Sequence, residues 1–147
     1  ELLEESPIIA AVKSQEGLEH SLKSECKVVF VLFGTICDID AIVAKIKAAG
    51  KIAIVHVDMI QGLSTKKVAV DFIAHNTKAD GIISTKNVLD AVESMPGEMP
   101  KILKIMREYT DIPLIAGGLL SDKKDVMAAF EAGVDAISAT NEDVWYI

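Results

Sequence analysis

Residues 28–58 read VVFVLFGTICDIDAIVAKIKAAGKIAIVHVD, which is the pattern of a strand, a helix and a second strand. The outer runs, 28–33 and 52–57, are apolar except for His56 and rich in β-branched residues. Strands of this kind are covered on both faces, as in a parallel sheet. Between them, four aliphatic residues recur at helical spacing, namely Ile39, Ile42, Val43 and Ile46. Gly50 then ends the helix, so we expect a right-handed βαβ unit.

The same pattern recurs along the rest of the chain. Further apolar runs occupy residues 7–12, 81–85, 91–95, 113–116 and 136–139. Amphipathic stretches separate most of them; in one, the expected inner face consists of Val68, Phe72 and Ile73. Seven such strands exceed the roughly five of a flavodoxin-like sheet. They predict an α/β fold, a TIM-type (β/α)₈ barrel, as one domain over residues 1–147.

The pattern breaks directly after Lys86. Only residues 87–90 separate the run that ends there from the next one, whereas a parallel crossover needs roughly a dozen residues. A barrel of this type also rarely has fewer than about 200 residues. We therefore predict a gap between Lys86 and Val88, where one βα unit is missing from the sequence. A genuinely shortened variant is the weaker alternative.

Composition excludes several classes of protein. Half of the 147 residues are apolar, and 15 Lys and Arg stand against 22 Asp and Glu, for a net charge of −7. These values argue against disorder and against a surface that is basic throughout. Cys26 and Cys37 have no metal-binding or disulfide-scaffold spacing. No apolar run is long enough to span a bilayer, and no leader pattern opens the chain. We expect a cytoplasmic protein without a metal, a cofactor or a membrane partner.

Two predicted loops have the features of a phosphate site. Gly117 and Gly118 follow the seventh strand of the expected barrel, and Thr140 and Asn141 follow the eighth. Exposed backbone amides beside a helix start attract anions, and in many barrels this pair of loops holds a phosphate group. We predict that it does so here. The alternative is that the glycines only form a tight turn and that Thr140 or Asn141 only caps a helix.

Polar side chains follow other strands at the same expected edge. His56 and Asp58 share one face at the end of the third strand. We predict that Asp58 accepts hydrogen bonds from ligand hydroxyls; the alternative is a loop cap. A lone histidine such as His56 is more often a core residue bonded to a neighbour. The other candidates would supply a hydroxyl, a carboxylate or positive charge, and they are Lys13, Ser84, Lys86 and Glu93. Lys86 and Glu93 have the alternative of being simply solvated.

Six motifs together resemble a known family. They are PIIAAVK (7–13), HVD (56–58), GIISTK (81–86), MPGEMP (95–100), IAGG (115–118) and ATNEDVW (139–145). Their order over essentially the whole chain is similar to that of the glycerol uptake operon antiterminator regulatory proteins. That family normally carries a further stretch between the third and fourth motifs, where the gap is predicted.

The resemblance implies a regulator, not an enzyme. Such proteins respond to glycerol 3-phosphate and bind leader mRNA, so that transcription passes a terminator in glycerol-utilisation operons. With this ligand, the positions of the candidates in the expected barrel predict three groups of ligand-binding residues. Gly117, Gly118, Thr140 and Asn141 would hold the phosphate, Asp58, Glu93 and Ser84 would meet the glycerol hydroxyls, and Lys86 or Lys13 would add charge.

Two clusters of basic residues are candidates for the RNA-binding surface. Phosphate contacts require clustered cations. Two expected helices carry such clusters, formed by Lys45 and Lys47 and by Lys101, Lys104 and Arg107. Each is alternatively a solvated helix face. Two other functions remain open, namely a TIM-barrel enzyme acting on a small phosphorylated substrate (isomerase, epimerase or aldolase type) and a phosphate sensor with a protein partner. The sequence does not decide whether the protein is a homodimer.

Overall fold

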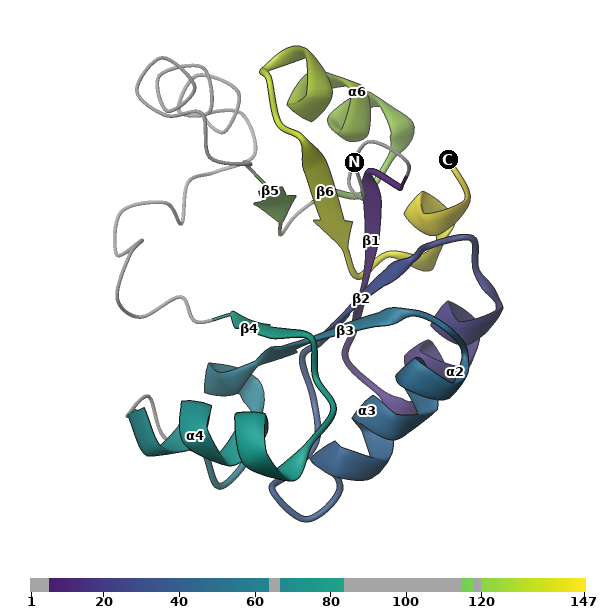
Figure 1. The fold of residues 1–147 in the computed structure, drawn as a ribbon. Helices are drawn as coiled ribbons and strands as arrows, with labels where there is room; N and C mark the ends of the chain where they lie inside the picture. The colour runs from purple at the N-terminus through teal and green to yellow at the C-terminus, as the bar shows by residue number, and fades with distance from the viewer. Residues whose placement is uncertain (1–5, 64–66, 84–114, 118–119) are drawn as a thin grey trace.

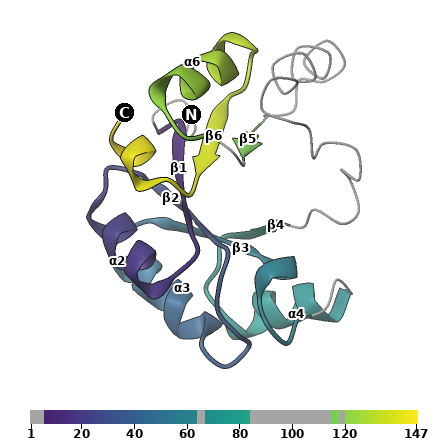
Figure 2. The ribbon, with the colours of Figure 1, turned by 180° about the vertical axis from the view of Figure 1, so that it is seen from behind.

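The structure is a computed structural model that describes residues 6–63, 67–83, 115–117 and 120–147. In these residues, six parallel strands form one curled sheet, and four α-helices pack outside the curve (Figure 1). The view from behind shows the same arrangement, with α2, α3, α4 and α6 all on the convex side (Figure 2). The chain is therefore an α/β protein, as predicted.

The first part of the chain alternates strands and helices. The elements are β1 (Ile8–Val12), α2 (Gln15–Lys23), β2 (Val28–Val31), α3 (Ile39–Ala48) and β3 (Ile52–His56). The βαβ unit expected over residues 28–58 is thus confirmed. All four predicted apolar residues of α3 are at most 4% exposed. Gly50 follows the helix in the left-handed conformation, with φ of 73°, which a residue with a Cβ adopts only at a cost.

The remaining described elements continue in the same way. They are η1 (Val57–Met59), α4 (Lys67–Asn76), β4 (Gly81–Ile83), β5 (Ile115–Gly117), α6 (Lys123–Glu131), β6 (Ala136–Ala139) and η2 (Glu142–Tyr146). The expected inner face of α4 is corrected at one position. Ala69 and Ile73 are buried and Phe72 is half-buried, but Val68 is 65% exposed. The buried row of α4 passes through Ala69 and Ile73, so Val68 lies at its outer margin.

Strand order shows how far the barrel extends. The order is β4-β3-β2-β1-β6-β5, and every pairing is parallel. The last strand pairs with the first through Ala10 and Ala139, which is the neighbour order of a barrel. The described residues form a six-stranded half-barrel, not the closed eight-stranded TIM barrel that the sequence predicted. Closure would have to occur between β4 and β5, where residues 84–114 lie outside the described part of the chain.

Both faces of the sheet are apolar, as the continuous runs predicted. On the outer face, Val29 and Val31 are completely buried in the cluster that includes the apolar side chains of α3. On the inner face, Ile9 and Phe30 form a second cluster with residues of β1 and β6. Burying one such side chain contributes about 1.5–3 kcal/mol. The inner cluster forms the floor beneath the carboxyl ends of the strands.

Candidate functional site

The candidate site lies at the carboxyl edge of the half-barrel. Because all six described strands are parallel, the loops that follow them emerge on the same side. Lys13 directly follows β1 and is exposed, and His56 is the last residue of β3. Gly117 ends β5, and Thr140 follows β6. The described candidates from these strands are therefore placed at one edge, as the sequence analysis expected. Three others, Ser84, Lys86 and Glu93, lie outside the described residues.

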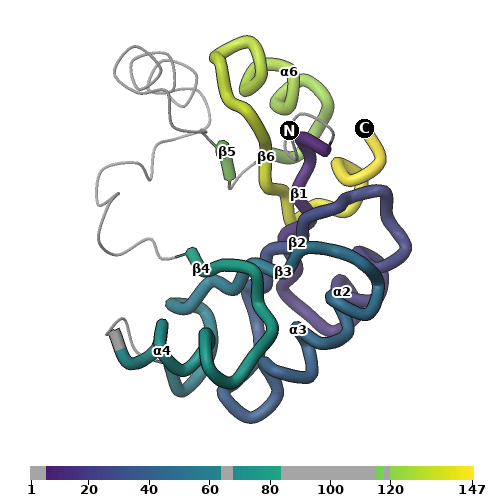
Figure 3. Tube along the Cα trace, in the orientation of Figure 1, coloured from purple at the N-terminus to yellow at the C-terminus, as the bar shows by residue number. Residues whose placement is uncertain are grey.

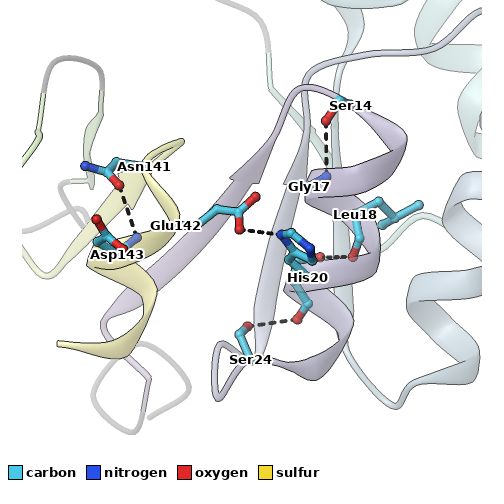
Figure 4. A network of polar contacts seen from close by, with 9 residues as sticks. Ser14, Gly17, Leu18, His20, Ser24, Asn141, Glu142 and Asp143 are labelled. Carbon is cyan, nitrogen blue, oxygen red and sulfur yellow. Dashed lines mark hydrogen bonds and ion pairs between the residues drawn. The ribbon is translucent and has the colours of Figure 1, made fainter.

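Asn141 joins the loops that follow β5 and β6. Its Nδ2 donates to the Ser121 carbonyl oxygen at 2.8 Å. Its Oδ1 accepts from the Asp143 amide at 3.1 Å and so caps η2 (Figure 4). The capping role considered for Asn141 is therefore present, and a second bond fixes the two loops together. Thr140, beside it, is exposed. Phosphate binding by these two residues stays a prediction.

Gly117 faces a polar side chain that sequence reasoning missed. It pairs with Ser138 of β6, and a Cβ built on Gly117 would lie 3.6 Å from the Ser138 Oγ. That separation is ordinary contact, so a small side chain fits there. Ser138 is the only polar residue of β6, and this interruption of an apolar strand was the available signal. Gly118 lies outside the described residues.

The start of α6 already carries negative charge. Asp122 Oδ1 accepts from the Asp125 amide at 2.9 Å, and Asp125 Oδ2 accepts from the Ser121 amide and hydroxyl at 3.1 and 2.9 Å. The bonds from Ser121 hold the pKa of Asp125 below its ordinary value. These two carboxylates already complement the helix dipole. The first turn of α6 therefore offers little attraction for a further anion.

His56 and Asp58 form a buried polar pair at the end of β3. Their side chains are only 12% and 6% exposed, and 3.9 Å separates His56 Nδ1 from Asp58 Oδ2. Within the described residues, Nδ1 of His56 is buried without a hydrogen-bond partner. The expectation of a core histidine bonded to a neighbour therefore does not hold for this nitrogen.

Backbone hydrogen bonds join the segment that follows β2 to the segment that follows η1. The Ile36 amide donates to the Gln61 carbonyl at 3.0 Å, and the Gln61 amide donates to the Gly34 carbonyl at 2.9 Å. These bonds extend the contact between the chains of β2 and β3 beyond the sheet. Gly34 has φ of 107°, and a Cβ there would lie 2.8 Å from Ile42 Cδ1. The positive φ favours glycine at this position, whereas the Ile42 methyl group could move aside.

The described RNA-binding candidates are paired with acids. Lys45 Nζ lies 3.1 Å from Glu19 Oε1, and Lys47 Nζ lies 2.7 Å from both carboxylate oxygens of Asp80. Both lysine charges are thus locally compensated, so RNA binding by this pair stays a prediction. The other candidates, Lys101, Lys104 and Arg107, lie outside the described residues.

No cluster of three or more His, Cys, Asp or Glu side chains in the described part of the chain could hold a metal ion. Likewise, none of the helices in the described ranges has the length and apolar character to cross a membrane.

The fold defines the class of protein, an α/β protein whose parallel strands follow barrel order. The model of the family described as "Glycerol-3-phosphate responsive antiterminator" matches residues 8–89 and 87–145, and the chain therefore belongs to this family. The family is regulatory and responds to glycerol 3-phosphate, which confirms the predicted resemblance and the expectation of a protein that is not an enzyme.

Individual relatives agree with this assignment. The glycerol uptake operon antiterminator regulatory protein of Listeria monocytogenes str. 4b F2365 has a solved structure that is 25% identical, with a TM-score of 0.84 over 94% of each chain. An antiterminator-related protein of Thermotoga maritima MSB8 is 24% identical, with a TM-score of 0.76 over 95% of this chain and 98% of that one, and supports the fold alone. The uncharacterized protein YgcP of Escherichia coli (strain K12) is 40% identical over 179 residues, covering 98% of this chain and 94% of YgcP.

Proposed function

We propose that this protein binds glycerol 3-phosphate at the carboxyl edge of the half-barrel and, in response, binds leader mRNA so that transcription reads through a terminator in glycerol-utilisation operons. This role places it in the cytoplasm. The observation that carries the proposal is the 2.8 Å bond from Asn141 to the Ser121 carbonyl. It holds the loops after β5 and β6 together, and this is the pair of loops that forms a phosphate site in many barrels.

The ligand would lie across the mouth of the half-barrel. Gly117, Gly118, Thr140 and Asn141 would hold its phosphate. Positive charge would come from Lys13 or Lys86. The pairing of β1 with β6 supports Lys13. In this pairing Ala10 lies opposite Ala139. Lys13 comes three residues after Ala10, and Thr140 comes one residue after Ala139, so both follow paired strands at the same edge. The glycerol hydroxyls would meet the remaining candidates, Asp58, Ser84 and Glu93.

Regulation would follow from a shift between two arrangements of the loops at the carboxyl edge of the half-barrel. A ligand moves such an equilibrium only by its difference in affinity for the two states. We propose that glycerol 3-phosphate favours the arrangement that binds RNA. On the described surface, RNA phosphates would replace Glu19 and Asp80 as partners of Lys45 and Lys47. Lys101, Lys104 and Arg107 are the other proposed contacts.

Two binding experiments test the proposal. Isothermal titration with glycerol 3-phosphate should give saturable heat, while glycerol should bind far more weakly because it lacks the phosphate. Filter binding with leader RNA across salt concentrations should show specific binding that increases with glycerol 3-phosphate. Equal binding to random RNA, or turnover of the ligand into a product, would overturn it. Light scattering on the same samples would show whether the RNA-binding species is a homodimer.

We also propose that one βα unit is missing between Lys86 and Val88. Two observations support this. The two segments that match the family model meet at residues 87–89. The alignment with YgcP spans 179 residues, which is 32 more than the 147 of this chain. Intact-mass measurement on the protein from its native cells would decide. A mass of 15.8 kDa would refute the gap, and a mass larger by about one βα unit would support it.

A further inference from the structure

We infer that His56 is a ligand-binding residue that, together with Asp58, recognises a hydroxyl group of a small polyol phosphate. This inference rests on the proposed function and adds to it a specificity for the hydroxylated end of the ligand. It starts from the position of the imidazole. His56 ends β3 on the face shared with Ile52 and Ile54, which pack against the inner cluster. Its register partner in β4 is Ile83, which also packs there.

The environment of Nδ1 is unusual for a core histidine. A buried nitrogen without a hydrogen bond costs about 1–3 kcal/mol, and native proteins keep few such groups without a reason. Asp58 Oδ2 lies 3.9 Å from this nitrogen. This separation is about 1 Å longer than a hydrogen bond. The two side chains therefore lie within ion-pair distance of each other, but His56 Nδ1 has no hydrogen bond within the described residues.

The gap fits one bridging hydroxyl. An oxygen about 2.8 Å from each atom would span the 3.9 Å between them. A hydroxyl both accepts and donates, so it can accept from Nδ1–H and donate to the Asp58 carboxylate. A phosphate oxygen could only accept, and the carboxylate would repel it. Nδ1 is buried in the structure, so the hydroxyl must displace the atoms that cover it. The bonds then form away from water, where hydrogen bonds are stronger.

Two substitutions test this assignment by keeping or removing a polar atom at the position of Nδ1. His56→Asn keeps a polar atom near the position of Nδ1, whereas His56→Phe keeps the ring shape without nitrogen. The matched control is His75→Asn on α4, because His75 is exposed and its Nδ1 bonds the Asp71 carbonyl of its own helix, at 2.7 Å. The two probes are glycerol 3-phosphate and n-propyl phosphate, which has the phosphate and carbon chain but no further hydroxyls.

Calorimetry on the full chain gives the readout. His56→Phe should weaken glycerol 3-phosphate binding by about tenfold or more and leave n-propyl phosphate binding unchanged. His56→Asn should retain most of the affinity, and His75→Asn all of it. Suppose that the wild type binds glycerol 3-phosphate. If His56→Phe then binds both probes as the wild type does, or loses affinity for both equally, this inference is wrong and the proposed function stands. If the wild type binds neither probe, the proposed function itself fails.

A second measurement does not depend on any variant folding. The imidazole ¹⁵N signals of wild-type His56 should shift on addition of glycerol 3-phosphate, because Nδ1 gains a hydrogen-bond partner. They should stay in place on addition of n-propyl phosphate. Unchanged signals with a saturating amount of glycerol 3-phosphate would overturn the assignment.

Discussion

His20 on α2 and Glu142 on η2 form an ion pair, with 2.5 Å between Nδ1 and Oε2, although 122 residues separate them in sequence (Figure 4). The second carboxylate oxygen, Oε1, lies 3.8 Å from where a Cβ on Gly17 would be. Figure 3 shows the C-terminal turn beside β1, as the contacts of η2 with β1 and α2 require. Because Glu142 directly follows Asn141, this pair braces one proposed phosphate loop against the first described helix.

Removing this pair should have a small, coupled effect on stability. Glu142→Ala and His20→Ala should each reduce the free energy of unfolding, and a double-mutant cycle should give a coupling of about 0.2–1 kcal/mol. The value is small because the side chains are 43% and 40% exposed. Urea denaturation measures it, with Glu131→Ala at the exposed end of α6 as the control. A coupling of zero would show that the contact contributes nothing.

The indole of Trp145 should matter more than that ion pair. Trp145 is 3% exposed, and its Nε1 donates to the Ala139 carbonyl at 2.7 Å. Trp145→Phe removes the donor and leaves a buried carbonyl with one partner fewer, at a cost of about 1–3 kcal/mol. Tyr146→Phe is the matched control, because Tyr146 is 63% exposed and should change stability by less than about 0.5 kcal/mol. Equal stability of both variants would contradict this prediction.

Asp80 should give stability that depends on pH. Desolvation alone would raise the pKa of Asp80, but bonds from Lys47 and from the Ala53 amide outweigh it and lower the pKa. A carboxyl group with a lowered folded-state pKa stabilises above its unfolded pKa, and that contribution is lost as the pH falls through the folded value. Asp80→Asn should therefore cost about 1 kcal/mol near pH 7, a figure reduced for the 35% exposure of the side chain.

Unfolding curves at several pH values test the sign of this effect. The difference between wild type and Asp80→Asn should shrink toward zero in acid, below the lowered pKa. Asp71→Asn, on the exposed side of α4, should show no comparable difference. A difference in unfolding free energy that stays constant from pH 7 down to strong acid would contradict the assignment of the effect to the Asp80 charge.

Salt dependence tests the proposed RNA contacts of α3. If Lys45 and Lys47 each meet one RNA phosphate, Lys45→Gln/Lys47→Gln should reduce the slope of log affinity against log salt by about 1.4 for single-stranded RNA. Filter binding with leader RNA provides the slope. Lys123→Gln/Lys124→Gln on the exposed start of α6 is the matched control. The contact assignment is refuted by a slope equal to that of the wild type.

The sequence was sufficient to predict those features of the fold that depend on residues close together in the chain. The βαβ unit, the buried stripe of α3 and the left-handed Gly50 follow from spacing within about 30 residues. Barrel order was also predictable, since the number of strands favoured it. The predicted closed barrel differs from the six-stranded half-barrel of the described residues, because closure would depend on residues 84–114, outside the described part of the chain.

The candidate site was less predictable, because its contacts join residues far apart in sequence. The bond between Asn141 and Ser121 spans 20 residues, and the pair of Lys47 with Asp80 spans 33. A sequence pattern cannot show that a lysine has a carboxylate partner on another element. Likewise, the unpartnered Nδ1 of His56 depends on the packing around it, whereas the sequence showed only a histidine in an apolar strand.

The most direct test of the central claim is calorimetry with glycerol 3-phosphate on wild type, Gly117→Asn and Gly117→Asp. The Gly117 position accepts a Cβ at ordinary contact distance from Ser138, so Asn and Asp differ there mainly in charge. A phosphate held between the loops after β5 and β6 would be repelled by the new carboxylate. We predict saturable heat for the wild type, reduced affinity for Gly117→Asn and no measurable binding for Gly117→Asp. Undiminished binding by Gly117→Asp, or no heat with the wild type, would contradict the account.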